Sequence, residues 1–459
     1  MNILVINGSP KGKYSITLQT VLYLEKCFPE HRFQILHAGQ RIKALQKDFS
    51  VAVKELEEAD LILFSYPVYT FIAPSQLHLF IELMKTSGVD LAGKFATQIT
   101  TSKHFYDVTA HRYIQDNCHD MEMKFVKGLS ADMDDLLTVK GQKEAKQFFK
   151  YVQWCMKKDS YEPLPEPSGS AAHVKVHVPE EAATPSGKMK PADKAKTMAR
   201  GKQVVIVTDC RPQDDQLKNM IARFQKVLPL QSRVVNIREY PFIGGCLGCF
   251  NCAVSGKCIY KDGFDDFLRN DIQGGAAIIY AFTIQDHSMG AAFKQYDDRQ
   301  FCNGHRTVTM GMPMGYLISG DYSKEFNLQM IIEGRAEVGG NFLAGVATDE
   351  TDPDTAIDRL AKTCVYAIRH RYIQPQNFYG VGGMKIFRDL IYLMQGMMKA
   401  DHQFYKQHGQ YDFPQKKKGT LVKMYLVGAL LSSPEIKAKM GNKMNEGMIA
   451  PYKKVLEKN

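Results

Sequence analysis

The sequence predicts an α/β protein in which a doubly wound parallel sheet occurs twice, followed by a helical extension. Short apolar segments alternate with segments of helical periodicity over residues 1–156 and again over residues 201–371. This alternation is typical of parallel sheets that carry helices on both faces. The strand segments are apolar almost throughout, as buried parallel strands are. A stretch rich in Pro, Ser, Ala and Glu separates the two halves, so we expect two domains joined by a linker.

The first domain is predicted to cover residues 1–156. Its expected strands are 2–7, 32–36, 60–66, 94–101 and 123–126, and its expected helices are 15–27, 74–86 and 142–156. The second strand leads into residues 37–41, where the sequence is His-Ala-Gly-Gln-Arg.

The linker is predicted at residues 157–200 and the second domain at residues 201–371. In this domain we expect strands at 203–208, 233–237, 276–282, within 307–319 and at 341–347, with helices at 213–226 and 355–371. The two halves resemble a weak internal repeat. Residues 372–459 are predicted as a basic helical C-terminal extension, with helices at 384–398 and 420–431. These helices are expected to pack on the second domain or bridge the two domains, and a role as a lid is the lesser alternative.

Composition and charge indicate a cytoplasmic protein. The first residues form an apolar strand segment without a basic leader, and no uncharged apolar run is long enough to span a bilayer. The net charge is +10, and residues 372–459 hold 14 Lys/Arg against 6 Asp/Glu, a net charge of +8. A basic tail can bind nucleic acid or an anionic membrane, but it is more often a solvated helical surface. We therefore expect no nucleic-acid partner and no transmembrane segment.

The most specific motif is a run of four cysteines. Cys246, Cys249, Cys252 and Cys258 are spaced C-x2-C-x2-C-x5-C. Reducing compartments keep thiols out of disulfides, so a compact run favours metal or redox chemistry. The spacing favours a [4Fe–4S] cluster. Zinc, which usually takes two pairs separated by a longer spacer, and a loop of free thiols are the alternatives.

Three loops of the first domain are predicted to converge on one ligand. A Gly-Ser-Pro loop lies between the first strand and its helix, where hydroxyls, amides and a helix N-terminus form an anion site suited to a phosphate. The third and fourth strands end at the same sheet edge, where ligands of open α/β sheets bind. The candidate binding residues are Ser9, Lys11, Ser15, Thr17, Pro67, Val68, Tyr69, Thr100, Thr101 and Ser102.

With these motifs, residues 1–156 resemble the NAD(P)H-dependent FMN reductases of the flavodoxin-like proteins. Residues 201–371 resemble the iron–sulfur flavoproteins of the same superfamily, whose compact cysteine motif also follows the second strand and precedes an acidic pair, here Asp265 and Asp266. The resemblance implies two flavodoxin-like domains in tandem, FMN at the three loops and a cluster on the four cysteines. It also implies a homo-oligomer, because flavin proteins of this family generally hold FMN near a subunit interface.

The two halves depart from the family pattern in complementary ways. The first half has no cysteine motif. The second half has Asp209, Asp214 and Asp215 where the phosphate loop should stand, with only Arg211 to offset them. The sequence therefore predicts one FMN per chain, on the first domain, with its edge facing the cysteine loop of the second domain.

The expected function is an FMN- and [4Fe–4S]-dependent oxidoreductase that moves electrons from NAD(P)H or a reduced carrier to an acceptor, either a small molecule or a redox partner protein. The alternative is a non-catalytic electron-transfer flavoprotein that docks on a partner reductase. A redox-responsive binding protein that uses the basic tail is a third possibility. His104 lies on a predicted flavin loop and is the candidate acid–base residue, although a lone histidine is more often structural.

Overall fold

The computed structural model describes residues 1–164, 173–180 and 203–433, and these residues form two parallel sheets with their helices. The chain divides into two compact units, Met1–His402 and Gln403–Asn459. Both sheets belong to the first unit, so the two predicted domains pack together as one body.

The first sheet has the strand order β2-β1-β3-β4-β5, and β6 pairs with β4. All its pairings are parallel, and Asn7 lies opposite Ser65 while Tyr66 lies opposite Thr100. The ends of β1, β3 and β4 therefore meet at one edge. The strands are β1 (Asn2–Asn7), β2 (Arg32–Leu36), β3 (Leu61–Pro67), β4 (Phe95–Ser102), β5 (Lys124–Phe125) and β6 (Leu129–Asp132).

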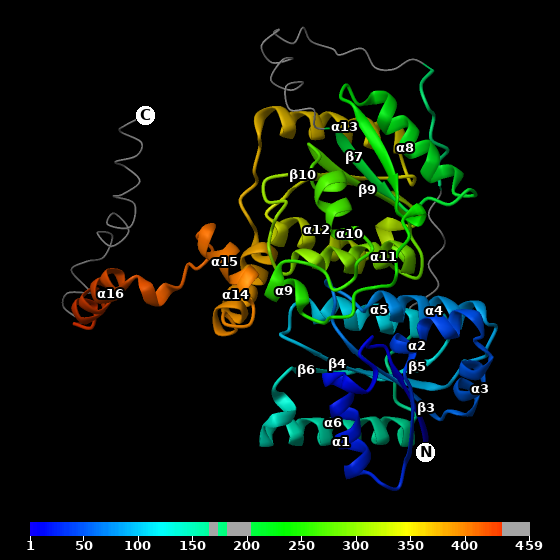
Figure 1. Cartoon of the computed structure of the whole chain (residues 1–459). Coiled ribbons are helices and arrows are strands. Elements are labelled where there is room, and N and C mark those ends of the chain that lie inside the picture. Colours follow the sequence, from blue (N-terminus) through cyan, green and yellow to red (C-terminus); the bar gives the residue numbers. More distant parts are fainter. Residues whose placement is uncertain (165–172, 181–202, 434–459) are drawn as a thin grey trace, which may run out of the picture. The chain divides into compact units, whose positions relative to one another are not determined.

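Helices cover both faces of this sheet (Figure 1). One face carries α1 and α6, and the other carries α2 to α5. The helices are α1 (Ile16–Cys27), α2 (Ala38–Lys47), α3 (Ser50–Glu58), α4 (Ser75–Thr86), α5 (Asp107–Asp120) and α6 (Val139–Lys158). β2 has the bounds predicted for the second strand, and the next residues, from Ala38, form α2, which the sequence did not predict. Gly39 of α2 packs against the backbone of Gly8 and Ser9.

The second sheet repeats this topology. Its order, β8-β7-β9-β10-β11, is the same 2-1-3-4-5 order in its own numbering, and every pairing is parallel. This order belongs to the doubly wound folds that bind ligands at a switch point. The strands are β7 (Val204–Thr208), β8 (Ser232–Asn236), β9 (Ala277–Thr283), β10 (Pro313–Ser319) and β11 (Phe342–Thr348).

The second sheet is also covered on both faces. One face carries α8 and α13, and the other carries α10, α11 and α12. The helices are α8 (Asp215–Val227), α9 (Asn251–Ser255), α10 (Phe264–Asp266), α11 (Gly290–Arg299), α12 (Phe326–Gly339) and α13 (Pro353–His370), and a π-helical turn spans Phe267–Ile272. Short 3₁₀ helices are found at Gly12–Tyr14, Asp135–Leu137, Ile237–Glu239, Gln300–Asn303, Tyr322–Lys324 and Pro414–Lys416.

One hydrophobic cluster spans the two domains. Phe80 of α4, Phe293 of α11 and Ile331 of α12 are all buried members of it. Separate clusters fill the outer faces, between β1 and α6 in the first domain and between β7 and α13 in the second. The helical layers that face each other are therefore a shared core rather than a surface contact.

Part of the predicted linker is bound to the second domain. Residues 165–172 and 181–200 lie outside the described ranges. In the described segment, Val176 is buried in the outer cluster, and the amide of Val174 donates to the carbonyl of Asp349. Val176 therefore belongs to the same buried cluster as Leu217 and Phe224 of α8.

The extension contains α14 (Phe378–Leu393), α15 (Lys399–Gln407) and α16 (Lys418–Leu431). α14 packs along α12, and its Phe387 ring lies 4.3 Å from the ring of Phe105 in the first domain. Packing on the second domain and bridging the two domains were the alternatives expected for the helices of the extension. No helix in the described ranges is long and apolar enough to cross a membrane.

Candidate functional site: a cavity between the two domains

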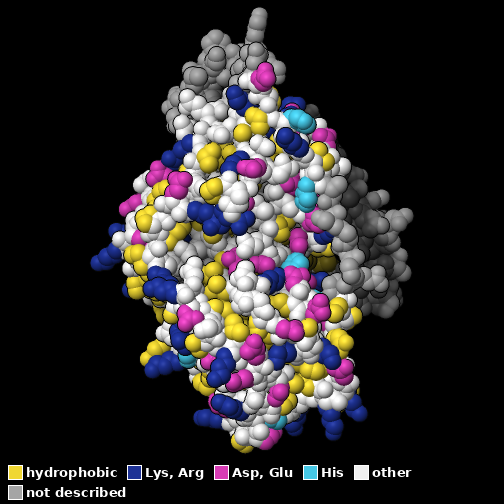
Figure 2. All heavy atoms as spheres, turned by 90° about the vertical axis from the view of Figure 1, so that its right-hand side faces the viewer, with side chains coloured by type: hydrophobic (Ala, Val, Ile, Leu, Met, Phe, Trp, Pro, Cys, Tyr) yellow, Lys and Arg dark blue, Asp and Glu magenta, His cyan; other side chains and the backbone are white. Residues whose placement is uncertain are grey.

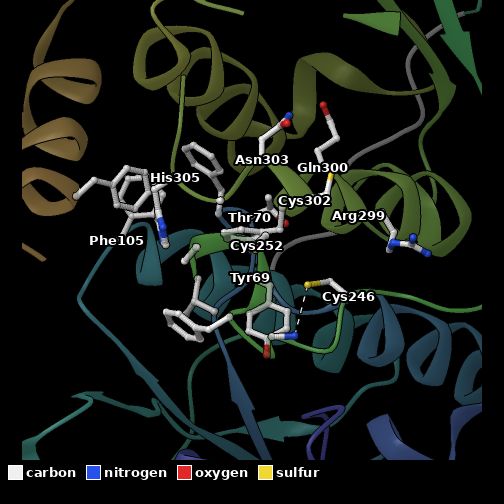
Figure 3. Close-up of a pocket in the computed structure, with 18 of the residues that line it drawn as sticks. Tyr69, Thr70, Phe105, Cys246, Cys252, Arg299, Gln300, Cys302, Asn303 and His305 are labelled. Carbon is white, nitrogen blue, oxygen red and sulfur yellow. Dashed lines mark hydrogen bonds between the residues drawn. The ribbon is translucent and has the colours of Figure 1, made fainter. Parts of the chain in front are cut away.

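A cavity of about 380 Å³ lies where the sheet edge of the first domain meets the second domain. Its wall contains the three predicted loops of the first domain, the cysteine loop, residues 299–309 of the second domain, and Ile386, Phe387 and Leu390 of α14. Figure 3 shows Tyr69 beside Cys246, with Phe105 and His305 placed toward the side of α14. The cavity therefore gathers side chains from every domain of the first unit.

The Gly-Ser-Pro loop is held by its own hydrogen bonds. The side chain of Asn7 accepts from the amide of Ser9 at 3.2 Å, and Ser9 Oγ accepts from the amide of Lys11 at 3.3 Å. Ser15 caps α1 by accepting from the amide of Leu18 at 3.4 Å. The hydroxyls of Ser9 and Ser15 act here as acceptors, so their own protons remain available to an anion in the cavity.

The other two loops are placed by strands β3 and β4. Thr17 Oγ1 and Thr101 Oγ1 are 2.6 Å apart, so α1 and β4 are tied together at the cavity. Pro67, Val68, Tyr69, Thr101 and Ser102 line the wall, together with Ser9, Lys11, Ser15 and Thr17. Thr100 does not line the cavity. Its Oγ1 lies 2.8 Å from Nε2 of His111, and burial lowers the pKa of His111 to about 4.

All four cysteines of the motif line the same cavity. Their loop touches the first domain directly, because a Cβ on Gly248 would stand 1.8 Å from Tyr69 Oη. The amide of Gly248 donates to Cys246 Sγ at 3.4 Å, and the amide of Cys258 donates to Asp265 at 2.6 Å. Gly248 also has φ +60°, which favours glycine.

The donor set of this loop suits a soft metal centre. None of the ten cysteines, all within the described ranges, is in a disulfide. Burial raises the pKa of Cys246 to about 12 and that of Cys252 to about 11, so ionising them as ligands requires a cationic centre. Within the described ranges no group of three or more His, Cys, Asp or Glu side chains is arranged around a single ion. The four thiols line one cavity, and thiolates are ligands of both zinc sites and iron–sulfur clusters.

Residues 299–309 form a wall that the sequence motifs did not indicate. Arg299 is buried and donates to both carboxylate oxygens of Asp262 at 2.8 Å, with its guanidinium 4.6 Å from the ring centre of Tyr260. His305 Nδ1 lies 2.9 Å from the buried carboxylate of Asp401. The only signal in the sequence was a cluster of charged residues, and such clusters are usually solvated.

Lys294 of α11 connects this part of the second domain to the Tyr69 loop. Its Nζ donates to the carbonyl of Tyr69 at 3.1 Å and to Thr70 Oγ1 at 2.8 Å, and it pairs with Asp298 and, at 3.4 Å, with Asp297. Lys294, Asp297 and Asp298 have no exposed side-chain surface. A buried ion-pair network of the second domain therefore positions a loop of the first.

His104 stands off the cavity wall, between Lys103 and Phe105, which both belong to it. Its side chain is half exposed, and Nδ1 lies 2.8 Å from Asp107. The acid–base role predicted for His104 would require this loop to move.

The corresponding first loop of the second domain is closed by internal ion pairs. Arg211 donates to both oxygens of Asp214, and Arg238 pairs with Asp209 at 3.0 Å. Burial raises the pKa of Asp209 to about 6 despite the neighbouring Arg238. Arg211, which was expected to offset the carboxylates of this loop, is therefore already paired with Asp214.

Residues 1–132 match the family model for the flavodoxin-like fold. The segment has the flavodoxin-like fold. The resemblance noted from the Gly-Ser-Pro loop and the fold predicted from the strand pattern are both confirmed. The second flavodoxin-like sheet has the same strand order.

Among known proteins, the chain is similar to an iron–sulfur flavoprotein of Archaeoglobus fulgidus, with 24% identity over 178 residues that cover 36% of this chain and 80% of the relative. Among solved structures, an NADH:FMN oxidoreductase in its apo form matches with a TM-score of 0.29 and 19% identity, covering 33% of this chain and 88% of that one. A general stress protein 14 of Treponema denticola in complex with FMN matches with a TM-score of 0.27 and 13% identity, covering 34% of this chain and 98% of that one.

Proposed function

We propose that this protein is an oxidoreductase that uses FMN and a [4Fe–4S] cluster to move electrons from NAD(P)H or a reduced carrier to an acceptor. The observation that carries the proposal is a single cavity lined by the phosphate-type loop, the Tyr69 loop and all four cysteines of the motif. The printed name of the Archaeoglobus relative, an iron–sulfur flavoprotein, agrees with this pair of cofactors.

FMN would be held by the first domain. Ser9, Lys11, Ser15 and Thr17 would bind its phosphate, because they offer hydroxyl protons, an ammonium and the N-terminal end of a twelve-residue helix. Val68 and Tyr69 would contact the flavin ring, and Thr101 and Ser102 its polar edge. Thr100, bonded to His111, would act only by fixing the end of β4.

The cluster would be held by Cys246, Cys249, Cys252 and Cys258. When bound, FMN accepts a hydride as two electrons and an iron–sulfur cluster passes electrons singly. The chain's own contribution is position. The contact between Gly248 and Tyr69 would keep the cysteine loop against the flavin loop, and Phe105 and Phe387 would form an aromatic part of the cavity wall.

One FMN per chain is expected. In the second domain, Asp209 and Asp214 occupy the turn that would receive a phosphate, and their arginine partners are already bound. A dianion there would meet two carboxylates without free cations to balance them.

The direct test is an anaerobic preparation of the full chain, with flavin, iron and acid-labile sulfide measured per chain. We expect about one FMN and about four irons with equal sulfide. Changing Cys249 to Ala should remove most of the iron and sulfide, whereas the matched change of Cys210, a thiol away from the cavity, should not. Zinc without labile sulfide, or iron retained in the Cys249→Ala variant, would contradict the cluster, and two FMN would contradict the division of roles.

The alternative is an electron carrier without a substrate of its own. Stopped-flow mixing with NADH or NADPH separates the two functions. Rapid bleaching of the flavin by a nicotinamide supports an oxidoreductase, whereas reduction only by a reduced carrier protein supports a carrier.

A further inference from the structure

Helix α16 exposes a set of large apolar side chains. It belongs to the second compact unit, residues 403–459. Its exposed apolar residues have between 37% and 80% of their surface accessible, and they are Leu421, Val422, Met424, Tyr425, Leu426, Val427 and Leu430. Exposed apolar residues are ordinary when scattered, but a contiguous set on one helix marks an interaction site.

These side chains surround the helix instead of forming a stripe. Each residue turns the helix by about 100°, so Leu421, Val422, Met424, Leu426 and Val427 point in directions spread over the whole circumference. A helix that is apolar all round is covered on every side, either by protein or by lipid. The 14 residues span about 21 Å, less than the roughly 30 Å of a hydrocarbon core, so the helix can enter one leaflet but cannot cross.

The charge next to these residues favours an anionic surface. Lys416, Lys417 and Lys418 precede the apolar stretch, Lys423 lies within it, and the sequence has no Asp or Glu from residue 413 to residue 434. By contrast, basic and acidic side chains are interspersed on the face of the molecule shown in Figure 2. Two copies of α16 packed together would bring like charges close, whereas anionic headgroups would neutralise them, and Lys423 can extend its stem toward the headgroups.

From the exposure, the all-round apolar surface and the lysine cluster, we propose that α16 is a membrane-surface anchor that enters the headgroup and acyl boundary of an anionic bilayer. This inference is independent of the cofactor proposal. It places the protein at a lipid surface, held by one helix.

The test is flotation of the full chain with large unilamellar vesicles of phosphatidylcholine and phosphatidylserine in a 7:3 ratio, against vesicles of phosphatidylcholine alone. We expect binding to the anionic vesicles that weakens as salt rises. Leu426→Asp should abolish it, whereas Leu137→Asp, at an 81% exposed position of the first domain, should not change it. Lys417→Gln with Lys418→Gln should weaken binding about 25-fold, at about fivefold per lysine, and Lys54→Gln with Lys140→Gln should not.

A second readout, tryptophan fluorescence, does not require the Leu426→Asp variant to fold. The chain has a single tryptophan, so Trp154→Phe combined with Tyr425→Trp places the only indole on α16. A blue shift of its emission on adding anionic vesicles supports insertion. Absence of flotation and of a blue shift would overturn the proposal. So would an oligomer, seen by light scattering without lipid, that Leu426→Asp dissociates, because α16 would then be a face for self-association.

Discussion

The buried cluster around Lys294 gives the sharpest test of how the second domain holds the flavin loop. Lys294 and Arg335 offer two positive charges to Asp297 and Asp298, so the cluster is neutral. Changing Lys294 to Met keeps most of the apolar stem and removes the charge. Two carboxylates then share a single cation without solvent access, and the Tyr69 carbonyl loses its donor.

Removing one partner of a buried ion pair usually costs about 3–5 kcal/mol of the free energy of unfolding. We expect a loss in this range for Lys294→Met, measured by urea denaturation followed by circular dichroism. Lys54→Met is the matched control: its side chain is 78% exposed, and it should change the free energy by less than about 0.5 kcal/mol.

A second variant separates charge from packing. Lys294→Met combined with Asp298→Asn restores neutrality, and the asparagine carbonyl can still accept from the amide of Ser75, 2.7 Å away in the present protein. The double variant should be more stable than Lys294→Met alone, with a coupling of about 1–3 kcal/mol. A loss below about 1 kcal/mol for Lys294→Met, or no recovery in the double variant, would refute the assignment of a stabilising buried network.

Three further outcomes are expected. Ser9→Asp places a carboxylate in the proposed phosphate loop, so flavin retained after gel filtration should fall at least tenfold, while unchanged flavin content would count against the site. Gly248→Ala adds a Cβ 1.8 Å from Tyr69 Oη and should reduce both flavin and iron per chain; full loading of both would show that the two loops need not touch. Burial disfavours the charged ring of His287, but its hydrogen bonds to Asp120 and Glu325 outweigh burial and raise the pKa to about 10. This stabilisation is complete below pH 6.5 and is lost toward pH 10, by up to about 1.4 kcal/mol per pH unit. His287→Gln should flatten that pH dependence of unfolding, and an unchanged slope would contradict the assignment.

The sequence predicted the strands well because buried parallel strands have a simple signature. The run from Leu61 to Tyr66 is apolar almost throughout. A strand that is buried on both faces shows this pattern whichever helices pack against it, so the pattern can be recognised without knowing the tertiary structure. α2 was missed because its amphipathic pattern is short and His37 provides no capping side chain. α11 was missed because Lys294, Asp297 and Asp298 look like a solvated surface, although all three are buried between the domains.

The site was predicted in the same uneven way. Loops that bind through backbone amides and small hydroxyl residues can be predicted from their position after a strand, as the loops of Ser9 and Thr101 were. The wall opposite them depends on how two domains pack, and Arg299 and His305 have no local pattern that announces a cavity. Their positions follow from long-range ion pairs with Asp262 and Asp401, which only the folded chain brings together.

The shared hydrophobic cluster has a consequence for how the two halves can be separated. One core contains Phe80 of the first half with Phe293 and Ile331 of the second. Each half produced alone would therefore expose a large apolar surface to water. Cutting the backbone between residues 181 and 202 should therefore yield a nicked protein whose fragments stay associated. Expressing the halves as separate polypeptides should likewise give fragments that are insoluble singly and complement each other when co-expressed. The covalent connection would then serve mainly to ensure that the two halves are synthesised in equal numbers.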